Sequence, residues 1–418
     1  MEESNCERDH QAHTQADSTP DYCRVPDIRF RGFTYAWERQ RLGGVSEFYS
    51  GGTPSVGIKE YYGGEIPFIR SAEINSEVTE LFLTKEGLKN SSARLVDIGD
   101  ILYALYGATS GEVGRARLKG AINQAILAIK PHMGYNSEYL TQWLRKSKHK
   151  IIETYLQGGQ GNLSGTIVKE LLVDFPSLTE QQKIGITLRS LDSLVTLHQR
   201  KLTKLHHIKK ALLEKMFPTP GSTIPEIRFR GFTETWERRK FGELYRPVSE
   251  KNDLSFGRDK AISVANMYFN PALYVTEDSY LATYNVMRLG DIAFEGNRNK
   301  HFAHGRFVEN TIGDGIVSHV FKVFRHVGDN YDLSYWKHAI NNEKLMKDVL
   351  TRSTKASTMM HELVTADFLE ESTLVPSLNE QRAIGAAIDS IDHLVTLYQH
   401  KLNKLHCIKK ALLEKMFV

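Results

Sequence analysis

The amino-acid sequence predicts an α+β protein in which two globular domains are separated by two long antiparallel coiled-coil helices, arranged as a pseudo-twofold internal repeat. Three observations predict this fold: a repeated frame, a heptad pattern inside the repeat, and β-rich segments between the repeated parts. A chain of 418 residues is too long for one compact core. We therefore expect several folding units.

The chain repeats itself at a period of about 200 residues, in two separate pieces. The matched pieces are residues 25–43 (VPDIRFRGFTYAWERQRLG) with 224–242 (IPEIRFRGFTETWERRKFG), and residues 176–217 with 376–417. The bodies between them share little beyond Gly-Asp-Ile, at Gly99 and at Gly290. A frame kept nearly identical around divergent bodies indicates one scaffold that presents two different recognition surfaces. Drift after a simple duplication is the alternative.

The repeat also sets the expected domain boundaries. We predict a flexible N-terminal tail at residues 1–24, a globular domain at 25–176, a long helix at 177–217, a second globular domain at 218–375 and a second long helix at 376–418.

Each long helix begins with a capping-box pattern, Ser177-x-x-Glu180 and Ser377-x-x-Glu380. Apolar residues then recur at alternating spacings of four and three, which is the signature of a coiled-coil seam. The predicted seam consists of Ile184, Leu188, Leu191, Val195, Leu202, Leu205 and Leu212, and of Ile384, Ile388, Ile391, Val395, Leu402, Leu405 and Leu412. Polar residues at the seam, His198/Tyr398 and Lys209/Lys409, either fix the register or mark places where the seam opens to solvent.

Both bodies alternate short β-branched and aromatic runs with glycine-rich turns, and we expect helices at about 137–155 and 332–350. Their loops carry side chains of the kinds that read base edges or hold phosphates. The candidates are Arg70, Ser71, Thr109, Asn123, Gln124, Gln157, Gln160 and Asn162 in the first body, and Asn266, Asn297, Arg298, Asn299, Lys300, His319 and Lys355 in the second.

The repeated frame resembles a known family. Pro-Ser-Leu-x-Glu-Gln before a long helix that ends in Lys-Lys-Ala-Leu-Leu-Glu-Lys-Met-Phe, and Ile-Arg-Phe-Arg-Gly-Phe-Thr-x-x-Trp-Glu ahead of each body, are similar to the specificity (S) subunits of type I restriction–modification systems. So are Gly107-Ala-Thr-x-Gly-x-x-Gly114 and Gly120-Ala-Ile-Asn-Gln-Ala125. The second body lacks these last elements and has Gly296-Asn-Arg-Asn-Lys300 instead, which favours a different DNA preference.

The resemblance implies two target-recognition domains, each reading one half of a bipartite, asymmetric site on double-stranded DNA. It implies two methyltransferase (M) subunits docked around the helices, and restriction/translocase (R) subunits added to that core. S-adenosylmethionine, ATP and Mg are then expected on the partner subunits, with no cofactor and no metal in this chain. The long helices would set the unread spacing, since about 1.5 Å per residue gives each a length of roughly 55 Å.

The sequence lacks recognisable catalytic chemistry. An Asn/Asp-Pro-Pro-aromatic methylation motif is missing, because Asn270-Pro271-Ala272 stops short of it, and the Gly-x-x-x-x-Gly-Lys-Ser/Thr phosphate loop is missing too. We therefore expect no enzyme activity in this chain. A coiled-coil scaffold that binds only proteins, and a cryptic nuclease or methyltransferase, are the alternatives.

Composition excludes other classes. Hydrophobic residues make up 41% and charged residues 25% of the chain, as in a folded globular protein, and no apolar run reaches the roughly 20 residues that span a bilayer. We expect a cytoplasmic protein without membrane contact. Cys6, Cys23 and Cys407 have unrelated spacings and are interpreted as reduced thiols. The net charge of +4 is compatible with a polyanionic partner but decides little.

Overall fold

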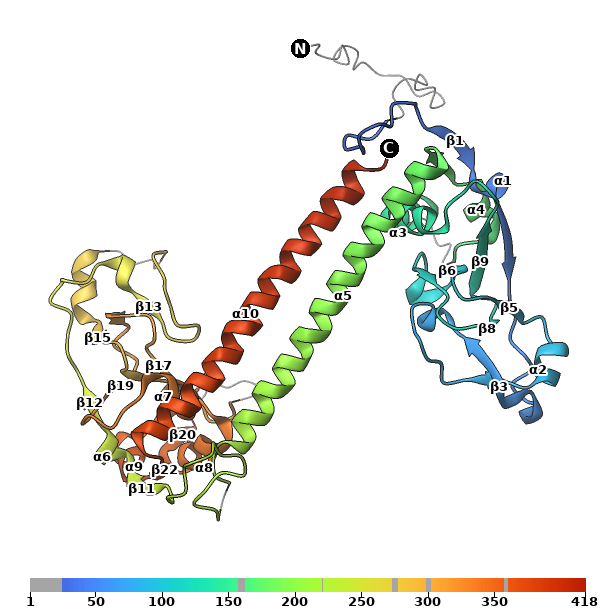
Figure 1. The fold of residues 1–418 in the computed structure, drawn as a ribbon. Helices are drawn as coiled ribbons and strands as arrows, with labels where there is room; N and C mark the ends of the chain where they lie inside the picture. Colours follow the sequence, from blue (N-terminus) through green and yellow to red (C-terminus); the bar gives the residue numbers. More distant parts are fainter. Residues whose placement is uncertain (1–24, 157–161, 220, 273–276, 298–301, 357–359) are drawn as a thin grey trace, which may run out of the picture. The chain divides into compact units, whose positions relative to one another are not determined.

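The computed structural model describes residues 25–156, 162–219, 221–272, 277–297, 302–356 and 360–418 (Figure 1). The predicted tail at residues 1–24, with Cys6 and Cys23, lies outside the described residues. The chain divides into two compact units. The first unit combines Met1–Leu197 with Leu402–Val418, and the second is His198–Lys401. Each unit thus contains one body, the start of one long helix and the end of the other.

The first unit is built from small sheets and the two helix segments. Its strands are β1 (Glu38–Arg41), β2 (Ser46–Ser50), β3 (Tyr62–Ile69), β4 (Phe82–Leu83), β5 (Arg94–Val96), β6 (Ile101–Ala104), β7 (Val113–Arg115), β8 (Gly120–Ile122), β9 (Ile126–Pro131) and β10 (Leu172–Phe175). Its helices are α1 (Leu42–Val45), α2 (Lys85–Lys89), α3 (Ser137–Tyr155), α4 (Gly165–Glu170), the first part of α5 (Leu178–Lys215) and the last part of α10 (Leu378–Lys415).

The second unit repeats much of this plan. Its strands are β11 (Glu237–Lys240), β12 (Tyr245–Val248), β13 (Ile262–Ser263), β14 (Tyr268–Phe269), β15 (Asn285–Met287), β16 (Ile292–Glu295), β17 (Arg306–Glu309), β18 (Gly315–Val317), β19 (Val323–His326), β20 (Thr354–Ala356), β21 (His361–Leu363) and β22 (Ser372–Val375). Its shorter helices are α6 (Phe241–Leu244), α7 (Leu333–Ala339), α8 (Glu343–Ser353) and α9 (Thr365–Glu370).

The two bodies share the order of two sheets although their sequences diverge, and their remaining sheets differ. A four-stranded sheet has the order β2-β9-β6-β7 in the first body and β12-β19-β16-β17 in the second. A two-stranded sheet joins the start of each body to its end, as β1-β10 and β11-β22. The prediction of an α+β fold with two sheet-rich domains and two long helices is confirmed.

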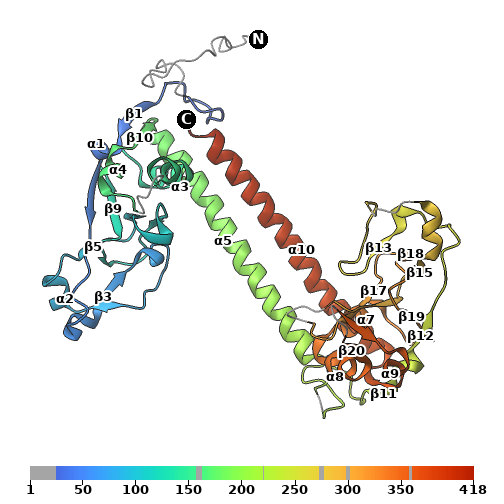
Figure 2. The same ribbon diagram turned by 180° about the vertical axis from the view of Figure 1, so that it is seen from behind.

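The long helices pack against each other in both units, and in each unit they run antiparallel. In the first unit, Ile184 and Leu188 of α5 share a core with Met416 and Phe417, which follow the end of α10. The ring of Phe417 lies 5.1 Å from that of Tyr139 in α3, and α3 lies beside α5 in both views (Figure 1, Figure 2). The core of each body is therefore completed by the helix end of the other repeat.

The same arrangement occurs in the second unit with residues that take equivalent places. Ile384 and Ile388 of α10 share a core with Met216 and Phe217, and the ring of Phe217 lies 5.7 Å from that of Tyr335. The helix segments of the two units thus bury side chains at equivalent positions of the repeat, as the repeated sequence requires.

Ion pairs hold the two lysine positions of the seam. In the first unit, the Lys409 ammonium contacts the Asp192 carboxylate, and in the second the Lys209 Nζ lies 2.5 Å from Asp392 Oδ1. All four side chains are partly buried. Both lysines have a carboxylate partner on the facing helix, which favours a role in fixing the register over an open seam.

Two local predictions differ from the structure. The helix predicted at 137–155 is present as α3, but the segment predicted as one helix at 332–350 forms two. Asn342 interrupts this segment because its side chain caps α8. It accepts hydrogen bonds from the backbone N–H groups of Lys344 and Leu345. The capping box predicted at the start of α5 is also only partly present. Ser177 Oγ accepts from the Glu180 N–H, as expected, but the Glu180 side chain binds Arg29 instead of its own helix start.

None of the helices in the described part of the chain is both long and apolar enough to cross a membrane.

A buried carboxyl group in the second unit makes its stability depend on pH. Glu309 is 3% exposed and accepts a hydrogen bond from the Tyr331 hydroxyl at Oε1, while its Oε2 contacts no hydrogen-bonding group among the described residues. Burial raises the pKa of Glu309 well above its ordinary value of 4.5. The folded unit therefore binds a proton that the unfolded chain has released, and stability falls as pH rises above that ordinary value.

We expect the free energy of unfolding of the second unit to fall by about 1.4 kcal/mol per pH unit from this group, until the pH exceeds the folded-state pKa. Glu309→Gln should remove this slope, because glutamine stays neutral. Urea unfolding at several pH values between 5 and 9, followed by hydrogen exchange in β17, measures it. Glu65→Gln, at an exposed position of the first unit, is the control. An unchanged slope in the Glu309 variant would contradict the assignment.

Candidate nucleic-acid interface

In the first body, the ends of several strands meet at one edge. Ile69 of β3 and Ile122 of β8 are partners in a parallel ladder, so Arg70 and Asn123 follow them side by side. The Leu105 N–H after β6 donates to the Ala125 carbonyl at 2.8 Å. Loops that are distant in sequence therefore converge on the same edge.

Six of the eight candidates in the first body lie on these loops, and two lie outside the described residues. Arg70 and Ser71 follow β3, and Asn123 and Gln124 follow β8. Thr109 lies in the short 3-10 turn Gly107–Thr109. Asn162 precedes Leu163, whose N–H donates to the Leu105 carbonyl at 3.0 Å. Gln157 and Gln160 lie outside the described residues.

Arg70 is already paired. Its guanidinium Nη2 lies 2.8 Å from Glu73 Oε1 and 2.8 Å from Glu80 Oε2. Burial of Glu73 opposes its ionisation, but the hydrogen bonds from Arg70 outweigh burial and hold the pKa of Glu73 at about 2. Arg70 would have to leave two carboxylates before it could bind a phosphate or a base.

Sequence reasoning missed Thr53, which follows β2 at the same edge. Its hydroxyl donates to Gln124 Oε1 at 2.7 Å, and both side chains are exposed. Two glycines bring Thr53 there, because a Cβ on Gly51 would lie 1.7 Å from the Ile122 carbonyl oxygen and one on Gly52 would lie 1.9 Å from Ser92 Oγ. In the sequence, only the Gly51-Gly52 pair before Thr53 indicates that the backbone passes close to its neighbours here.

The second body has an equivalent edge with different side chains. The Phe294 N–H donates to the Lys322 carbonyl at 3.0 Å, which corresponds to the Leu105 bond in the first body, and the His361 N–H donates to the Gly296 carbonyl at 2.9 Å. Among the candidates, Asn266 follows β13, Asn297 follows β16, His319 follows β18 and Lys355 lies in β20; all four are exposed. Arg298, Asn299 and Lys300 lie outside the described residues.

His304 is a second residue that sequence reasoning missed. Its ring lies 5.0 Å from that of His361, beside the bridge that joins Asn297 to Met360. The two edges therefore lie beside four-stranded sheets of the same strand order and differ in chemistry. The first presents amides and hydroxyls, while the second adds histidines and lysine.

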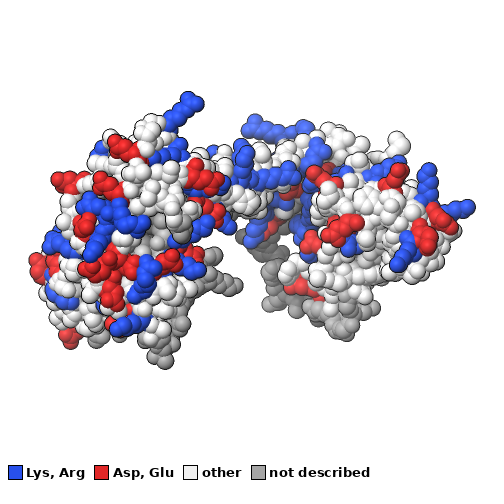
Figure 3. Space-filling view, turned by 90° about the horizontal axis from the view of Figure 1, so that it is seen from below, with Lys and Arg blue, Asp and Glu red and all other residues white. Residues whose placement is uncertain are grey.

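Figure 3 shows Lys and Arg side chains interspersed with Asp and Glu on the visible face of the molecule.

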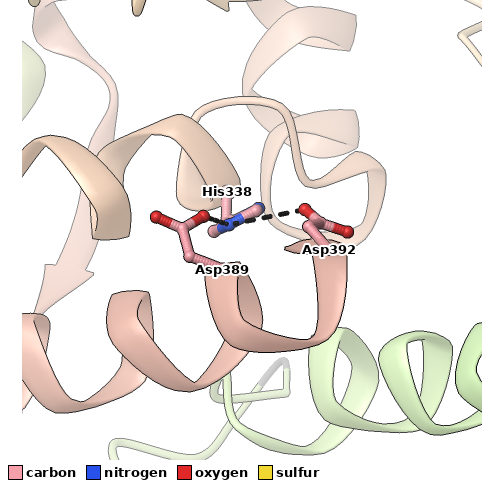
Figure 4. Close-up of side chains that lie close together, drawn as sticks. All are labelled: His338, Asp389 and Asp392. Carbon is pink, nitrogen blue, oxygen red and sulfur yellow. Dashed lines mark hydrogen bonds and ion pairs between the residues drawn. The ribbon is translucent and has the colours of Figure 1, made fainter. Parts of the chain in front are cut away.

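A histidine and two aspartates lie together where α7 packs on α10 (Figure 4). His338 Nε2 is 2.9 Å from Asp389 Oδ1 and 4.0 Å from Asp392 Oδ2, a spacing that could hold a metal ion. Both carboxylates already have lysine partners, however, with Lys337 Nζ 2.5 Å from Asp389 and Lys209 Nζ 2.5 Å from Asp392. Burial lowers the pKa of His338, which favours a neutral ring.

In the first unit, α3 packs on α5 at the corresponding place, without a histidine. Gln142 of α3 donates to Asp192 Oδ2 at 2.9 Å, and Arg145 lies 3.0 Å from the same oxygen. We therefore assign the cluster around His338 to the attachment of the body to its long helix.

The long helices also carry a row of exposed apolar side chains away from the seam. Its members are Leu194, Leu197 and Ile408 in the first unit, and Leu394, Leu397 and Ile208 in the second. Each is more than a third exposed. The segments 201–217 and 401–417 differ only at Thr203/Asn403 and His207/Cys407, which are exposed, whereas their other exposed positions are identical.

Comparison with known proteins agrees with this architecture. Residues 35–207 match the type I restriction modification DNA specificity domain. The chain is 32% identical over 233 residues to the type I restriction enzyme MjaIX specificity subunit of Methanocaldococcus jannaschii, which is 52% of this chain and 53% of that protein. The chain thus aligns with about half the length of this relative.

Two further similarities cover nearly the whole chain. The MjaVIII specificity subunit of the same organism is 21% identical over 90% of this chain and 91% of its own length. The crystal structure of a type I restriction–modification system S subunit from M. genitalium has the same fold, with a TM-score of 0.61 at 16% identity over 94% of this chain and 99% of that chain. Residues 35–207 therefore match the type I restriction modification DNA specificity domain, and the chain is similar along most of its length to type I restriction enzyme specificity subunits.

Proposed function

We propose that this chain is the DNA sequence-recognition subunit of a type I restriction–modification complex and reads a bipartite, asymmetric site with one half-site per body. The observation that carries the proposal is the pair of equivalent edges. The same sheet order, β2-β9-β6-β7 and β12-β19-β16-β17, supports loops of different composition. Two equivalent frames with unlike hydrogen-bonding groups are suited to two unlike base sequences.

The side chains of the edges suit base reading. Asn123, Gln124 and Asn162 in the first body, and Asn266 and Asn297 in the second, carry amides that pair with base edges in the major groove. The exposed lysine and histidine of the second edge add contacts to phosphates, which position a protein on DNA without specifying its sequence.

The exposed apolar row of the long helices supports two identical partners. Solvent-exposed positions tolerate substitution, so their identity in the two repeats indicates a bound surface. The exposed leucines and isoleucine in each unit suit an apolar helix face of a partner. Two equal rows suit two methyltransferase subunits. In this proposal the partner subunits supply adenine methylation and DNA cleavage, with S-adenosylmethionine, ATP and Mg bound there, while the paired helices set the unread spacing.

Co-expression of the chain with its methyltransferase partner, followed by single-molecule sequencing of host DNA, tests the proposal. We expect methylated adenines in a split motif with two unlike halves and a fixed gap. Exchange of residues 44–175 for those of a relative should change one half only, and exchange of residues 243–375 should change the other. A change in both halves from either exchange would refute one-body, one-half-site reading.

A further inference from the structure

The exposed apolar side chains of the long helices alternate with lysines along one flank of each helix. Residues 194, 197, 201, 204 and 208 of α5 each stand one position before a seam residue, which places them on the same flank. They are Leu, Leu, Lys, Lys and Ile, and the residues at 394, 397, 401, 404 and 408 of α10 are the same. We name these five positions of each helix the lysine–leucine flank. All of its side chains are exposed.

The two repeats differ on the back of the helices and agree on this flank. Between residues 192–217 and 392–417, the positions opposite the seam all differ, as Ser193/His393, Arg200/His400 and His207/Cys407. The flank on the other side of the seam differs at Thr203/Asn403, whereas the lysine–leucine flank is identical at all five positions. Exposed positions tolerate substitution unless something covers them. The identity therefore marks the lysines, as well as the leucines, as part of a bound surface.

The lysines of the flank have no anion within the chain to pair with. Residues 193–213 and 393–413 contain neither aspartate nor glutamate. In the described part of the chain, Lys204 and Lys404 are in no ion pair, since the carboxylates nearest to these segments pair with other lysines. Lys201 Nζ lies 5.5 Å from the centre of an aromatic ring in the seam. These cations are thus available to an acidic partner.

In the second unit the flanks of both helices form one surface. The helices are antiparallel there, and each flank precedes the seam by one residue, so both flanks lie on the same side of the pair. Lys201, Lys204 and Ile208 of α5 therefore share this side with Leu394 and Leu397 of α10. A helix that covers the three apolar side chains also covers the two lysines. Because burying an ammonium group without an opposite charge is costly, that helix has to supply carboxylates.

The charge of the flank also decides which partner it accepts. A second copy of this chain would bring lysines against lysines with no carboxylate between them, and like charges across an interface are unfavourable. A partner with an acidic and apolar helix face matches both parts of the flank. The leucines and isoleucine thus provide contact area, while the lysines exclude self-association.

We infer that the lysine–leucine flank in each unit binds an acidic amphipathic helix, whose apolar side chains cover the leucines and isoleucine and whose carboxylates pair with the lysines. The inference rests on the proposed function, in which two methyltransferase subunits dock on the long helices, and it adds the charge of the surface that docks. Since salt screens ion pairs, the partners should bind more weakly as the ionic strength rises.

The test uses the full chain purified with its methyltransferase partner, and native mass spectrometry counts the bound subunits at a series of partner concentrations. The double variant Lys201→Glu, Lys204→Glu reverses the charge of the flank in the second unit only. It should weaken the binding of one partner subunit by about a hundredfold, because carboxylates then oppose carboxylates. At concentrations that saturate the wild type, the variant should retain one methyltransferase subunit instead of two.

Two further variants separate the ion pairs from general effects. Arg200→Glu, Lys210→Glu makes the same change in net charge at exposed positions off the flank, and should retain two subunits with wild-type affinity. Lys201→Gln, Lys204→Gln removes the charge without reversing it, and its affinity should lie between those of the wild type and the glutamate variant. Unchanged hydrogen exchange in α8 and α10 shows that each variant is folded.

Three outcomes overturn the inference. The first is a glutamate variant that binds two subunits as tightly as the wild type does. The second is an equal loss of binding in the Arg200→Glu, Lys210→Glu control, and the third is normal assembly with weaker binding of DNA of any sequence, which would assign the lysines to DNA phosphates. In all three the proposed function stands. A wild-type chain that binds no methyltransferase subunit would remove the proposed function as well.

Discussion

Phe417→Ala should destabilise the first unit, although Phe417 belongs to the second repeat of the sequence. The side chain is 3% exposed and packs with Trp37, Tyr139 and Ile184 in the core of the first body. Removing a buried phenylalanine side chain costs about 3–5 kcal/mol, because the cavity closes only in part. We expect hydrogen exchange in α3 and β6 to accelerate accordingly, measured by mass spectrometry.

Phe217→Ala is the matched variant, since Phe217 takes the equivalent place beside Trp236 and Tyr335. It should accelerate exchange in α7 and β16 and leave α3 largely unaffected. If Phe417→Ala instead loosened the second unit, the assignment of the helix ends to the units would be wrong.

Arg228→Met should cost the second unit about 3–5 kcal/mol, because it leaves a carboxylate buried without its cation. The Glu380 side chain is 1% exposed, and both of its oxygens accept hydrogen bonds from Arg228, at 2.6 Å and 2.7 Å. This bidentate pair joins the frame motif that precedes the second body to the first turn of α10. Urea unfolding followed by hydrogen exchange in α10 measures the loss.

The first unit offers the matched control, since Arg29 makes the same contact with Glu180 at 2.7 Å and 2.8 Å. Arg29→Met should produce a similar loss in the first unit and none in the second. The double variant Arg228→Met, Glu380→Gln should recover part of the stability, because no charge then remains buried. A double variant as unstable as the single one would indicate that the arginine acts through packing alone.

The parts of the fold that the sequence predicts are those set by local patterns. The heptad spacing of α5 and α10 and the apolar face of α3 are periodic, so the helices could be predicted with their approximate ends. The break between α7 and α8 could not, because the capping by Asn342 competes with a helical pattern that continues through it. Glu180 fits a capping box by spacing, but a cation far away in the sequence takes its side chain.

At the candidate interface, too, local features could be predicted from the sequence and contacts between distant residues could not. The residue types that read bases could be listed from the loops, and the described ones in the first body lie at one strand-end edge. Their availability could not be predicted in full. The Glu73 carboxylate that pairs with Arg70 is only three residues away, but the second carboxylate, of Glu80, and the Thr53 hydroxyl that contacts Gln124 come from more distant parts of the chain. Their contacts with DNA stay predictions.

The core of each body is completed by the helix end of the other repeat, and this also affects the order in which the two bodies fold during synthesis. The first body leaves the ribosome early, but its aromatic pocket around Tyr139 stays open until Met416 and Phe417 have been made. The second body receives Met216 and Phe217 before its own residues emerge. The N-terminal half of the nascent chain therefore exposes apolar surface until residues 416 and 417 have been added.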